Sequence, residues 1–283
     1  MPMSTYKNAL LPMISYPQPT LPSAIAAAVD AAAALNLRVF GLNLEVEPPP
    51  SAGSSGYAMP FVGATIDVEE AKTFANAEAI AREFLSQTRH RGMEAELRRV
   101  VCHALDASGV AAEAARLFDI TIVTLAPHAR TDRELAEAIV FGSGRPVLLL
   151  PSSYPAQLAP FDRVLVAWDA SRASARALCD ALPLLRRAKE VSVVSVSNEH
   201  SRVAQSMSYV ERWLSDHRVH ANCTRVDMHA TTEFSEIATH AKNVNANILV
   251  MGAFGHSRIR DFILGGVTKS VLANMTMPVL FSH

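Results

Sequence analysis

The sequence predicts an α/β protein built from two tandem open sheets, each with five parallel strands and with helices on both faces. Two observations support this prediction. Short apolar, β-branched runs alternate with longer helical patterns along the chain, which is typical of βαβ units around a parallel sheet. The order of these elements is also similar in the two halves, so the chain reads as a repeat whose period is half its length.

In the first half, strands are expected at residues 8–11, 38–45, 94–102, 120–125 and 146–150. Helices are expected at residues 23–35, 66–91, 110–117 and 135–141. Residues 48–60 (PPPSAGSSGYAMP) are rich in proline, glycine and serine. This composition indicates an exposed loop or flap.

The second half shows the alternation more clearly. Strands are expected at residues 163–168, 190–196, 222–228, 248–251 and 278–281. Helices are expected at residues 171–187, 205–217, 232–243 and 267–274. Ser171 is expected to cap the first of these helices, because a serine hydroxyl accepts a hydrogen bond from the first helical turn.

Two pairs of segments carry the repeat. DITIVTL (residues 119–125) aligns with NILVMGAF (247–254), and GRPVLLLP (144–151) aligns with TMPVLFSH (276–283). Prolines gather between the halves, as expected for a joint. The predicted parts are a domain at residues 1–150, a linker at 151–160 and a domain at 161–283.

Composition narrows the class of protein. The chain has 283 residues, 49% of them hydrophobic and 19% charged, and a net charge of −1. These values suit compact domains and give no overall attraction to nucleic acid or to an acidic membrane. Three cysteines without regular spacing form no disulfide framework and fit a reducing compartment. No membrane span is expected in the alanine-rich stretch at residues 23–37, so the expected location is the cytoplasm.

The segment at residues 251–268, MGAFGHSRIRDFILGGVT, carries the candidate chemistry. It begins where a predicted strand ends and finishes where the last predicted helix begins. Gly252 and Gly255 permit close approach of a ligand to bare backbone. Gly265 and Gly266 lie where the helix N-terminus favours a phosphate. Possible cationic contacts on the intervening loop are His256, Arg258 and Arg260.

A second interpretation of the same segment needs no ligand. Glycines between a strand and a helix can serve packing alone, and HSRIR can be a solvated loop. The segment is not a P-loop, because that motif requires Gly-Lys-Ser/Thr in succession. It is not the dinucleotide fingerprint either, because that motif follows the first strand of its unit.

The spacing of glycine, two residues, glycine, nine residues and glycine is met by Gly252, Gly255 and Gly265. It resembles the nucleotide-binding signature of the universal stress protein family. That signature continues with Ser or Thr, whereas this chain has Gly266, and Thr268 is the candidate substitute hydroxyl.

Other parts of the chain add to the resemblance. Asp169 ends the first strand of the second half (VAWDAS), where ATP-binding members of the family place an aspartate near the adenosine. Met251 before the first glycine and the closing PVL of the last strand also fit. The resemblance covers most of residues 161–283 and, more weakly, the first half. In the first half Ile14 aligns with Asp169, and no Gly-x-x-Gly follows residues 120–125.

The resemblance implies a Rossmann-like fold of the adenine-nucleotide-binding type, and a stress-response protein that binds ATP, with or without Mg²⁺, as a signal or conformational clamp. It also implies that the first half kept the fold and lost the site, and that the two halves pack as the subunits of a dimer do. An unknown protein partner and a homodimer complete these expectations. The implied nucleotide-binding residues are Asp169, Met251, Gly252, Gly255, His256, Arg258, Gly265, Gly266, Val267 and Thr268.

Several alternatives stay open. An aspartate between a strand and a helix is often only an N-cap, so Asp169 has a structural interpretation beside the ligand one. A ligand-free interaction module with a decayed site is the second functional hypothesis. A slow ATPase is the third, although the sequence offers no evident carboxylate base and no Walker-type Mg²⁺ ligands. No catalytic residue is assigned.

Three further features invite a functional interpretation. His217, His220 and Cys223 recur at three-residue intervals and suggest a metal site, but a solvated helix end explains them better. Trp168 is expected either to stack on a base or to pack in the core. Cys179 is expected to be buried.

Overall fold

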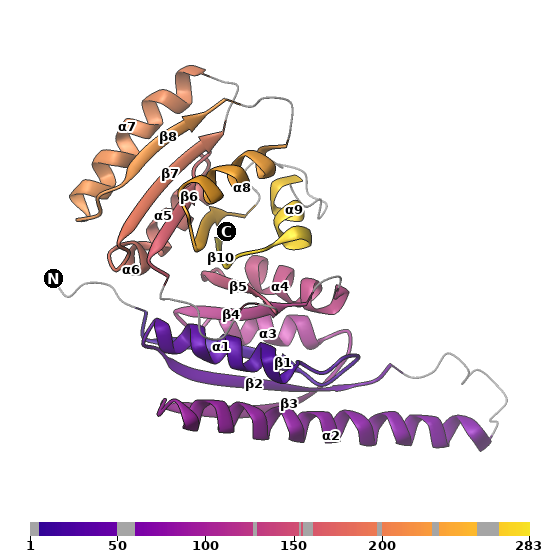
Figure 1. Ribbon diagram of the computed structural model, residues 1–283. Coiled ribbons are helices and arrows are strands. Elements are labelled where there is room, and N and C mark those ends of the chain that lie inside the picture. The colour runs from indigo at the N-terminus through magenta and orange to yellow at the C-terminus, as the bar shows by residue number, and fades with distance from the viewer. Residues whose placement is uncertain are drawn as a thin grey trace.

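The computed structural model of the chain is an α/β fold with ten strands in one sheet (Figure 1). The described residues are 6–49, 60–126, 129–152, 154, 161–196, 200–227, 232–253 and 266–283. For residues 60–67, 200–205 and 266–269, the backbone alone is described. The predicted fold class, α/β with parallel strands and helices on both faces, is confirmed.

Each half contributes five strands. Those of the first half are β1 (Asn8–Ile14), β2 (Arg38–Glu47), β3 (Ala95–His103), β4 (Ile120–Leu125) and β5 (Val147–Pro151). Those of the second half are β6 (Arg163–Ala167), β7 (Glu190–Val196), β8 (Asn222–Val226), β9 (Ile248–Gly252) and β10 (Val279–Ser282). The order across the sheet is β3-β2-β1-β4-β5-β10-β9-β6-β7-β8. All pairs within a half are parallel, and the two halves have the same internal order.

The two five-stranded sheets join through β5 and β10, which pair antiparallel. Val147 lies opposite Phe281, and Leu149 lies opposite Val279. All four side chains are buried. The pairing satisfies two strand edges that would otherwise expose unpaired backbone groups. The sequence predicted two separate sheets, and their junction into one is a finding of the structure.

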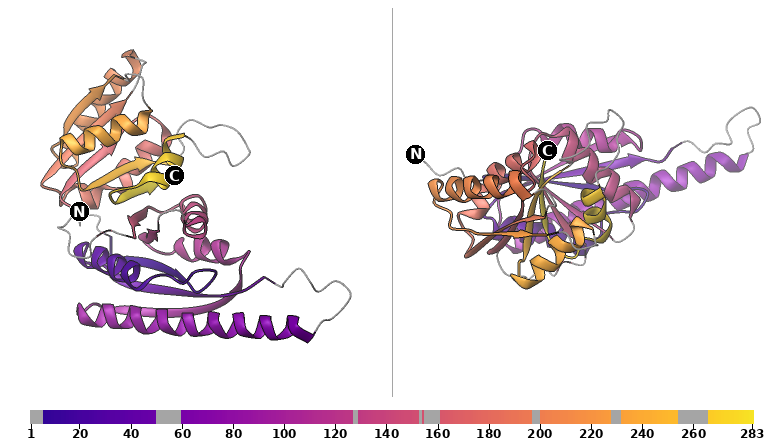
Figure 2. Two further views of the ribbon diagram at one scale, coloured as in Figure 1. Left: turned by 45° about the vertical axis from the view of Figure 1, so that its right-hand side comes forward. Right: turned by 90° about the horizontal axis from the view of Figure 1, so that it is seen from above.

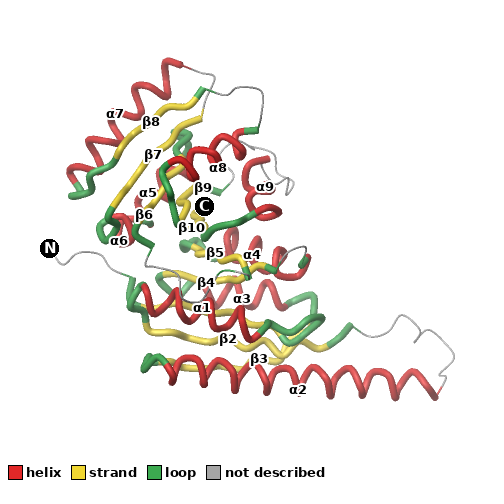
Figure 3. The backbone as a smooth tube through the Cα atoms, in the orientation of Figure 1, coloured by secondary structure: helices red, strands yellow, loops and turns green. Residues whose placement is uncertain are grey.

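Helices cover both faces of this sheet (Figures 2 and 3). One face packs against α1 (Pro22–Ala34), α2 (Pro60–His90), α5 (Arg172–Asp180), α6 (Leu182–Leu185) and α7 (His200–Asp216). The other face packs against α3 (Ala107–Ala115), α4 (Arg130–Gly142), α8 (Glu233–Asn243) and α9 (Gly266–Asn274). Among the described helices, none has the length and apolar character that a bilayer span requires.

Two helix boundaries differ from the sequence-based expectation. The helix expected at residues 171–187 is divided into α5 and α6, with Pro183 at the second position of α6. A proline has no N–H to donate to the Cys179 carbonyl, so the hydrogen-bond ladder is interrupted there. α2 begins at Pro60, six residues before the predicted start at residue 66, and extends past the sheet (Figure 1). Residues 50–59 of the expected flap lie outside the described residues.

The repeat is also visible in the polar contacts that connect neighbouring strands. In the first half, the Asp119 carboxylate accepts hydrogen bonds from the backbone N–H groups of Lys7 (2.7 Å) and Asn8 (3.2 Å). In the second half, the Asn247 side-chain oxygen accepts one from the Arg163 N–H at 3.1 Å. Asp119 and Asn247 precede β4 and β9, which the sequence alignment also made equivalent.

Asp162 anchors the same edge in the second half. Its carboxylate accepts a hydrogen bond from Asn247 Nδ2 at 2.9 Å and lies 2.9 Å from Lys189 Nζ. The hydrogen bond from Lys189 is the largest cause that lowers the pKa of the Asp162 carboxyl, and the Asn247 hydrogen bond acts in the same direction. The charged form of Asp162 therefore stabilises the folded protein.

We expect Asp162→Asn to lower the urea midpoint of unfolding at pH 7, and the difference from wild type to shrink on acidification below pH 3.8. The sign follows from the lowered pKa: the stabilisation is present above the unfolded value of 3.8 and is lost as pH falls through the folded value. Urea titrations at neutral, mildly acidic and strongly acidic pH check this. Glu113→Gln on the exposed face of α3 is the matched control. An Asp162→Asn deficit that does not change with pH would contradict the charge argument.

Candidate functional site

The predicted site residues that the structure describes gather at the carboxyl edge of the sheet in the second half. β6 and β9 are adjacent and parallel, with Ala167 opposite Met251. Asp169 and Gly252 therefore come to the same edge on neighbouring strands. The chain leaves β6 toward β7 on one side and later returns to β9 on the other. Ligands of open α/β sheets bind at such a reversal of strand order.

Asp169 is exposed and belongs to a tight turn before α5. Its Oδ1 accepts a hydrogen bond from the Ser171 N–H at 2.9 Å. Ala170 between them has a left-handed backbone with φ of 59°. The N-cap is Ser171, as the sequence predicted, because its hydroxyl accepts a hydrogen bond from the Ser174 N–H at 3.1 Å. Asp169 therefore does not serve as the N-cap of this helix.

Gly252 has a packing role that is visible in the structure. A Cβ at this position would lie 2.4 Å from the carbonyl carbon of Ala173 and 2.5 Å from the Ser174 nitrogen. Both atoms belong to the backbone of α5, so the absence of a side chain lets the start of α5 approach β9 closely. Met251, the preceding residue, is buried among the side chains under α8 and α9. Packing therefore accounts for this first glycine of the motif.

The remaining predicted site residues divide into two groups. Gly255, His256, Arg258 and Gly265, together with Arg260, lie outside the described residues. Gly266, Val267 and Thr268 form the first turn of α9, of which the backbone is described. Because α9 leads back into β10, which is parallel to β9, its first turn lies at the same carboxyl edge as Asp169.

The corresponding place in the first half is occupied by the chain's own side chains. In the first half Ala9 of β1 lies opposite Ile120 of β4, and in the second half Val164 of β6 lies opposite Ile248 of β9. Ala9 and Val164 are therefore equivalent positions. This register puts Ile14 at the position of Asp169, as the sequence alignment did, and Ile14 is buried.

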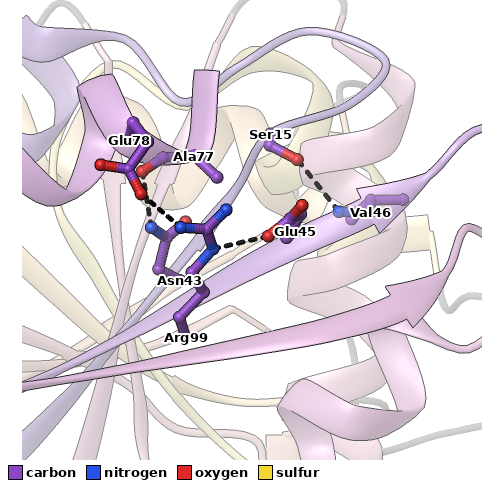
Figure 4. Close-up of polar contacts among 7 residues, drawn as sticks. All are labelled: Ser15, Asn43, Glu45, Val46, Ala77, Glu78 and Arg99. Atoms are coloured by element: carbon purple, nitrogen blue, oxygen red, sulfur yellow. Dashed lines mark hydrogen bonds and ion pairs between the residues drawn. The ribbon is translucent and has the colours of Figure 1, made fainter. Parts of the chain in front are cut away.

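Polar groups next to Ile14 are engaged internally (Figure 4). The Ser15 hydroxyl accepts a hydrogen bond from the Val46 N–H at 3.0 Å, and Asn43 Nδ2 donates to the Ala77 carbonyl at 2.8 Å. Arg99 bridges Glu45 and Glu78 beside them. These contacts tie β1, β2, β3 and α2 together at the carboxyl edge.

A side-chain hydrogen bond also holds the loop after β4. The carboxylate of Asp132, in the first turn of α4, accepts a hydrogen bond from the Ala126 N–H at 3.0 Å. Burial raises the pKa of the Asp132 carboxyl, and the hydrogen bond from Ala126 opposes that shift. In the second half, the corresponding loop begins the glycine motif.

The other candidate residues are placed as follows. His217 Nδ1 lies 2.8 Å from the Trp213 carbonyl, and its ring stacks on Trp213 with centroids 4.0 Å apart. Burial raises the pKa of the Cys223 thiol to about 11. In the described parts of the chain, no three His, Cys, Asp or Glu side chains come together in a way that could hold a metal ion. The expectation that Cys179 is buried is wrong, because it lies on the exposed side of α5.

Comparison with known proteins identifies the second half. Residues 160–283 match the family model described as the universal stress protein family. This half is a universal stress protein domain. The resemblance predicted from the glycine spacing, Asp169 and the closing PVL is thereby confirmed. A search of curated proteins found no match to the chain.

Solved structures extend the likeness to the whole chain. A universal stress protein from Archaeoglobus fulgidus aligns with a TM-score of 0.67 and 17% identity, covering 98% of each chain. A functionally unknown protein from Pseudomonas aeruginosa aligns at 0.57 and 13% identity, covering 98% of this chain and 92% of its own. The cytoplasmic domain of a prokaryotic cation chloride cotransporter aligns at 0.51 and 13% identity, with 98% and 95% coverage. At these identities, the matches show that the fold is shared over the whole chain.

Proposed function

We propose that this protein is a cytoplasmic stress-response regulator whose universal stress protein domain binds ATP or a related adenine nucleotide. The site is the carboxyl edge at β6 and β9. The observation that carries the proposal is that Asp169 follows β6 and the first turn of α9 leads into β10, which puts both at the carboxyl edge of the sheet where the strand order reverses. The family membership of residues 160–283 supports it.

Each described element has a chemical role in this proposal. The exposed Asp169 carboxylate accepts a hydrogen bond from a ribose hydroxyl or the adenine amine. The first turn of α9 offers backbone N–H groups and the positive end of the helix dipole to phosphate oxygens. Gly255, His256, Arg258 and Gly265 of the connecting segment complete the site, with Mg²⁺ as an accompanying ion. The bound nucleotide acts as a signal or clamp, and an unknown protein partner reads it.

A ligand-free interaction module is the competing function. It is favoured by the packing role of Gly252, which removes one glycine from the evidence for a ligand. Gly266 in place of the family's Ser or Thr points in the same direction.

We expect Asp169→Ala to weaken ATP binding by about tenfold to a hundredfold, the loss of a hydrogen bond to a charged group. Calorimetric titration of ATP into protein stripped of nucleotide, with and without Mg²⁺, measures it. The wild-type chain should bind at one site with micromolar affinity. Asp106→Ala is the matched control, because Asp106 is an exposed aspartate that precedes α3 in the first half. It should leave the affinity unchanged.

Two results would reject this assignment. An unchanged affinity in folded Asp169→Ala would remove Asp169 from the site. Absence of heat at millimolar ATP in the wild-type protein would favour the ligand-free interaction module.

A further inference from the structure

An apolar pocket lies between α5 and α7, on the face of the sheet that these helices cover. Its volume is about 280 Å³. The residues that line it are Trp168, Ala175, Leu178, Cys179, Ser206, Tyr209, Val210 and Trp213. None of the residues named in the proposed nucleotide site lines it, and Trp168, for which the sequence left base stacking or core packing open, is partly buried against the core and lines this pocket. The proposed nucleotide binding therefore does not explain this pocket.

The pocket has a fixed floor and an aromatic wall. Leu178 and Val210 are each 4% exposed and belong to the core. The indole N–H of Trp168 donates to the Ser206 hydroxyl at 3.2 Å, which holds the ring in place. Tyr209 is 72% exposed, so most of this large aromatic side chain is in contact with solvent.

The pocket does not follow from the fold that the two halves share. In the first half, the equivalent helices α1 and α2 pack directly against each other. The inward side of α1 is made largely of alanine, which allows this close approach. Asp30 of α1 forms an ion pair with Arg91, which directly follows α2. At the equivalent place in the second half, two tryptophans and a tyrosine lie between the helices, whereas in the first half the two helices are in direct contact.

The side chains that line the pocket favour an uncharged, aromatic occupant. Among the lining residues that the structure describes, none carries a carboxylate, an amine or a guanidinium. Cys179 is exposed, but the partial loss of hydration beside its neighbours is the largest cause that raises the pKa of its thiol, so this side chain is uncharged at neutral pH. A charged group placed here would lose hydration without gaining a partner. Indole and phenol rings, by contrast, bind flat rings by stacking or edge contacts.

We propose that this pocket binds a small molecule through an uncharged, planar aromatic group of one or two fused rings. A volume of about 280 Å³ accommodates a group of this size. The exposed neighbours of the lining residues along α5 and α7 include the polar or charged Arg176, Ser208, Glu211 and Arg212. The apolar lining is therefore small, whereas a stable protein partner needs about 800 Å² of contact on each side.

The protein carries its own reporter for this site, because its two tryptophans, Trp168 and Trp213, both line the pocket. The probe is 2-naphthol, a neutral two-ring compound whose absorption overlaps tryptophan emission. We expect it to quench the intrinsic fluorescence of the full chain with a saturable, single-site curve. Saturating ATP and the Asp169→Ala substitution should both leave this curve unchanged, which separates the pocket from the proposed nucleotide site.

The decisive variant is Ala175→Leu, which places a larger side chain at the rim from an exposed position of α5. Leucine is a good helix former, so the fold should be retained. We expect the affinity for 2-naphthol to fall at least about tenfold, because the pocket is filled. Ala79→Leu, at an exposed position of α2, is the matched control and should bind as the wild type does.

A second measurement does not depend on fluorescence. In a Cys223→Ser background, 2-naphthol should slow alkylation of Cys179 by the neutral reagent N-ethylmaleimide. Quenching that does not saturate, or equal probe affinity in wild type and Ala175→Leu, would overturn the proposal. A wild-type dimer in sedimentation that Ala175→Leu converts to monomer would also overturn it, by assigning the pocket to a protein interface.

Discussion

Gly252→Val is expected to destabilise the protein by about 3 kcal/mol, because it overpacks a site closed by backbone. A Cβ alone would lie 2.4 Å from the Ala173 carbonyl carbon and 2.8 Å from the Ala173 Cβ. The side chain cannot rotate away from these atoms, so the start of α5 must move off β9. Urea unfolding monitored by circular dichroism measures the loss.

Gly109→Ala is the control for this prediction. Gly109 lies in α3, and an added Cβ there meets nothing within 4 Å. Alanine should stabilise the helix by about 0.5–1 kcal/mol. If Gly252→Val were as stable as wild type, the close approach of α5 to β9 would be wrong.

This result bears on how the site is tested. A loss of nucleotide binding in Gly252→Val would follow from unfolding as readily as from loss of a ligand contact. Asp169→Ala is the informative variant, because the exposed Asp169 side chain contributes little to the core.

Phe281→Ala is expected to cost about 3–5 kcal/mol, the typical effect of removing a buried phenylalanine ring. Phe281 is 1% exposed and lies on β10 opposite Val147 of β5. It therefore packs at the junction of the two halves. Next to it, the ring of His283 contacts Phe141 of the first half, with centroids 5.2 Å apart. Urea unfolding of the full chain measures the effect.

Phe74→Ala provides the same truncation on the surface. Phe74 lies on α2, is 52% exposed and contacts the Arg99 guanidinium. Its loss should cost about 1 kcal/mol or less. Equal costs for Phe74→Ala and Phe281→Ala would contradict the antiparallel junction. Separate unfolding transitions for the two halves in the wild-type chain would contradict it as well.

The elements of the fold could be predicted because each is encoded locally. β4 was predicted at residues 120–125 and is found there. Hydrophobic periodicity and turn residues act over a few positions, so they are readable along the chain. The break between α5 and α6 was also readable in principle from Pro183. The early start of α2 was not, because the Gly- and Ser-rich composition before it favours a loop.

The family of the second half was also predictable. The spacing of Gly252, Gly255 and Gly265 and the position of Asp169 predicted the family, and the strand register agrees with the predicted alignment of Ile14 with Asp169. The role of an individual residue depends on its neighbours in space. The sequence alone does not show whether Asp169 or Ser171 caps the helix, and the hydrogen bond from the Ser174 N–H identifies Ser171.

The chain's residues therefore specified an α/β repeat, the order of strands and helices along each half and a glycine motif typical of one family. The antiparallel joining of β5 and β10, the packing of Gly252 against α5 and the aromatic pocket emerged from three-dimensional packing alone. The physical reason is the separation in sequence between the residues that interact. Secondary structure follows from preferences of neighbouring residues, whereas these three features depend on contacts between side chains and backbone far apart in the sequence.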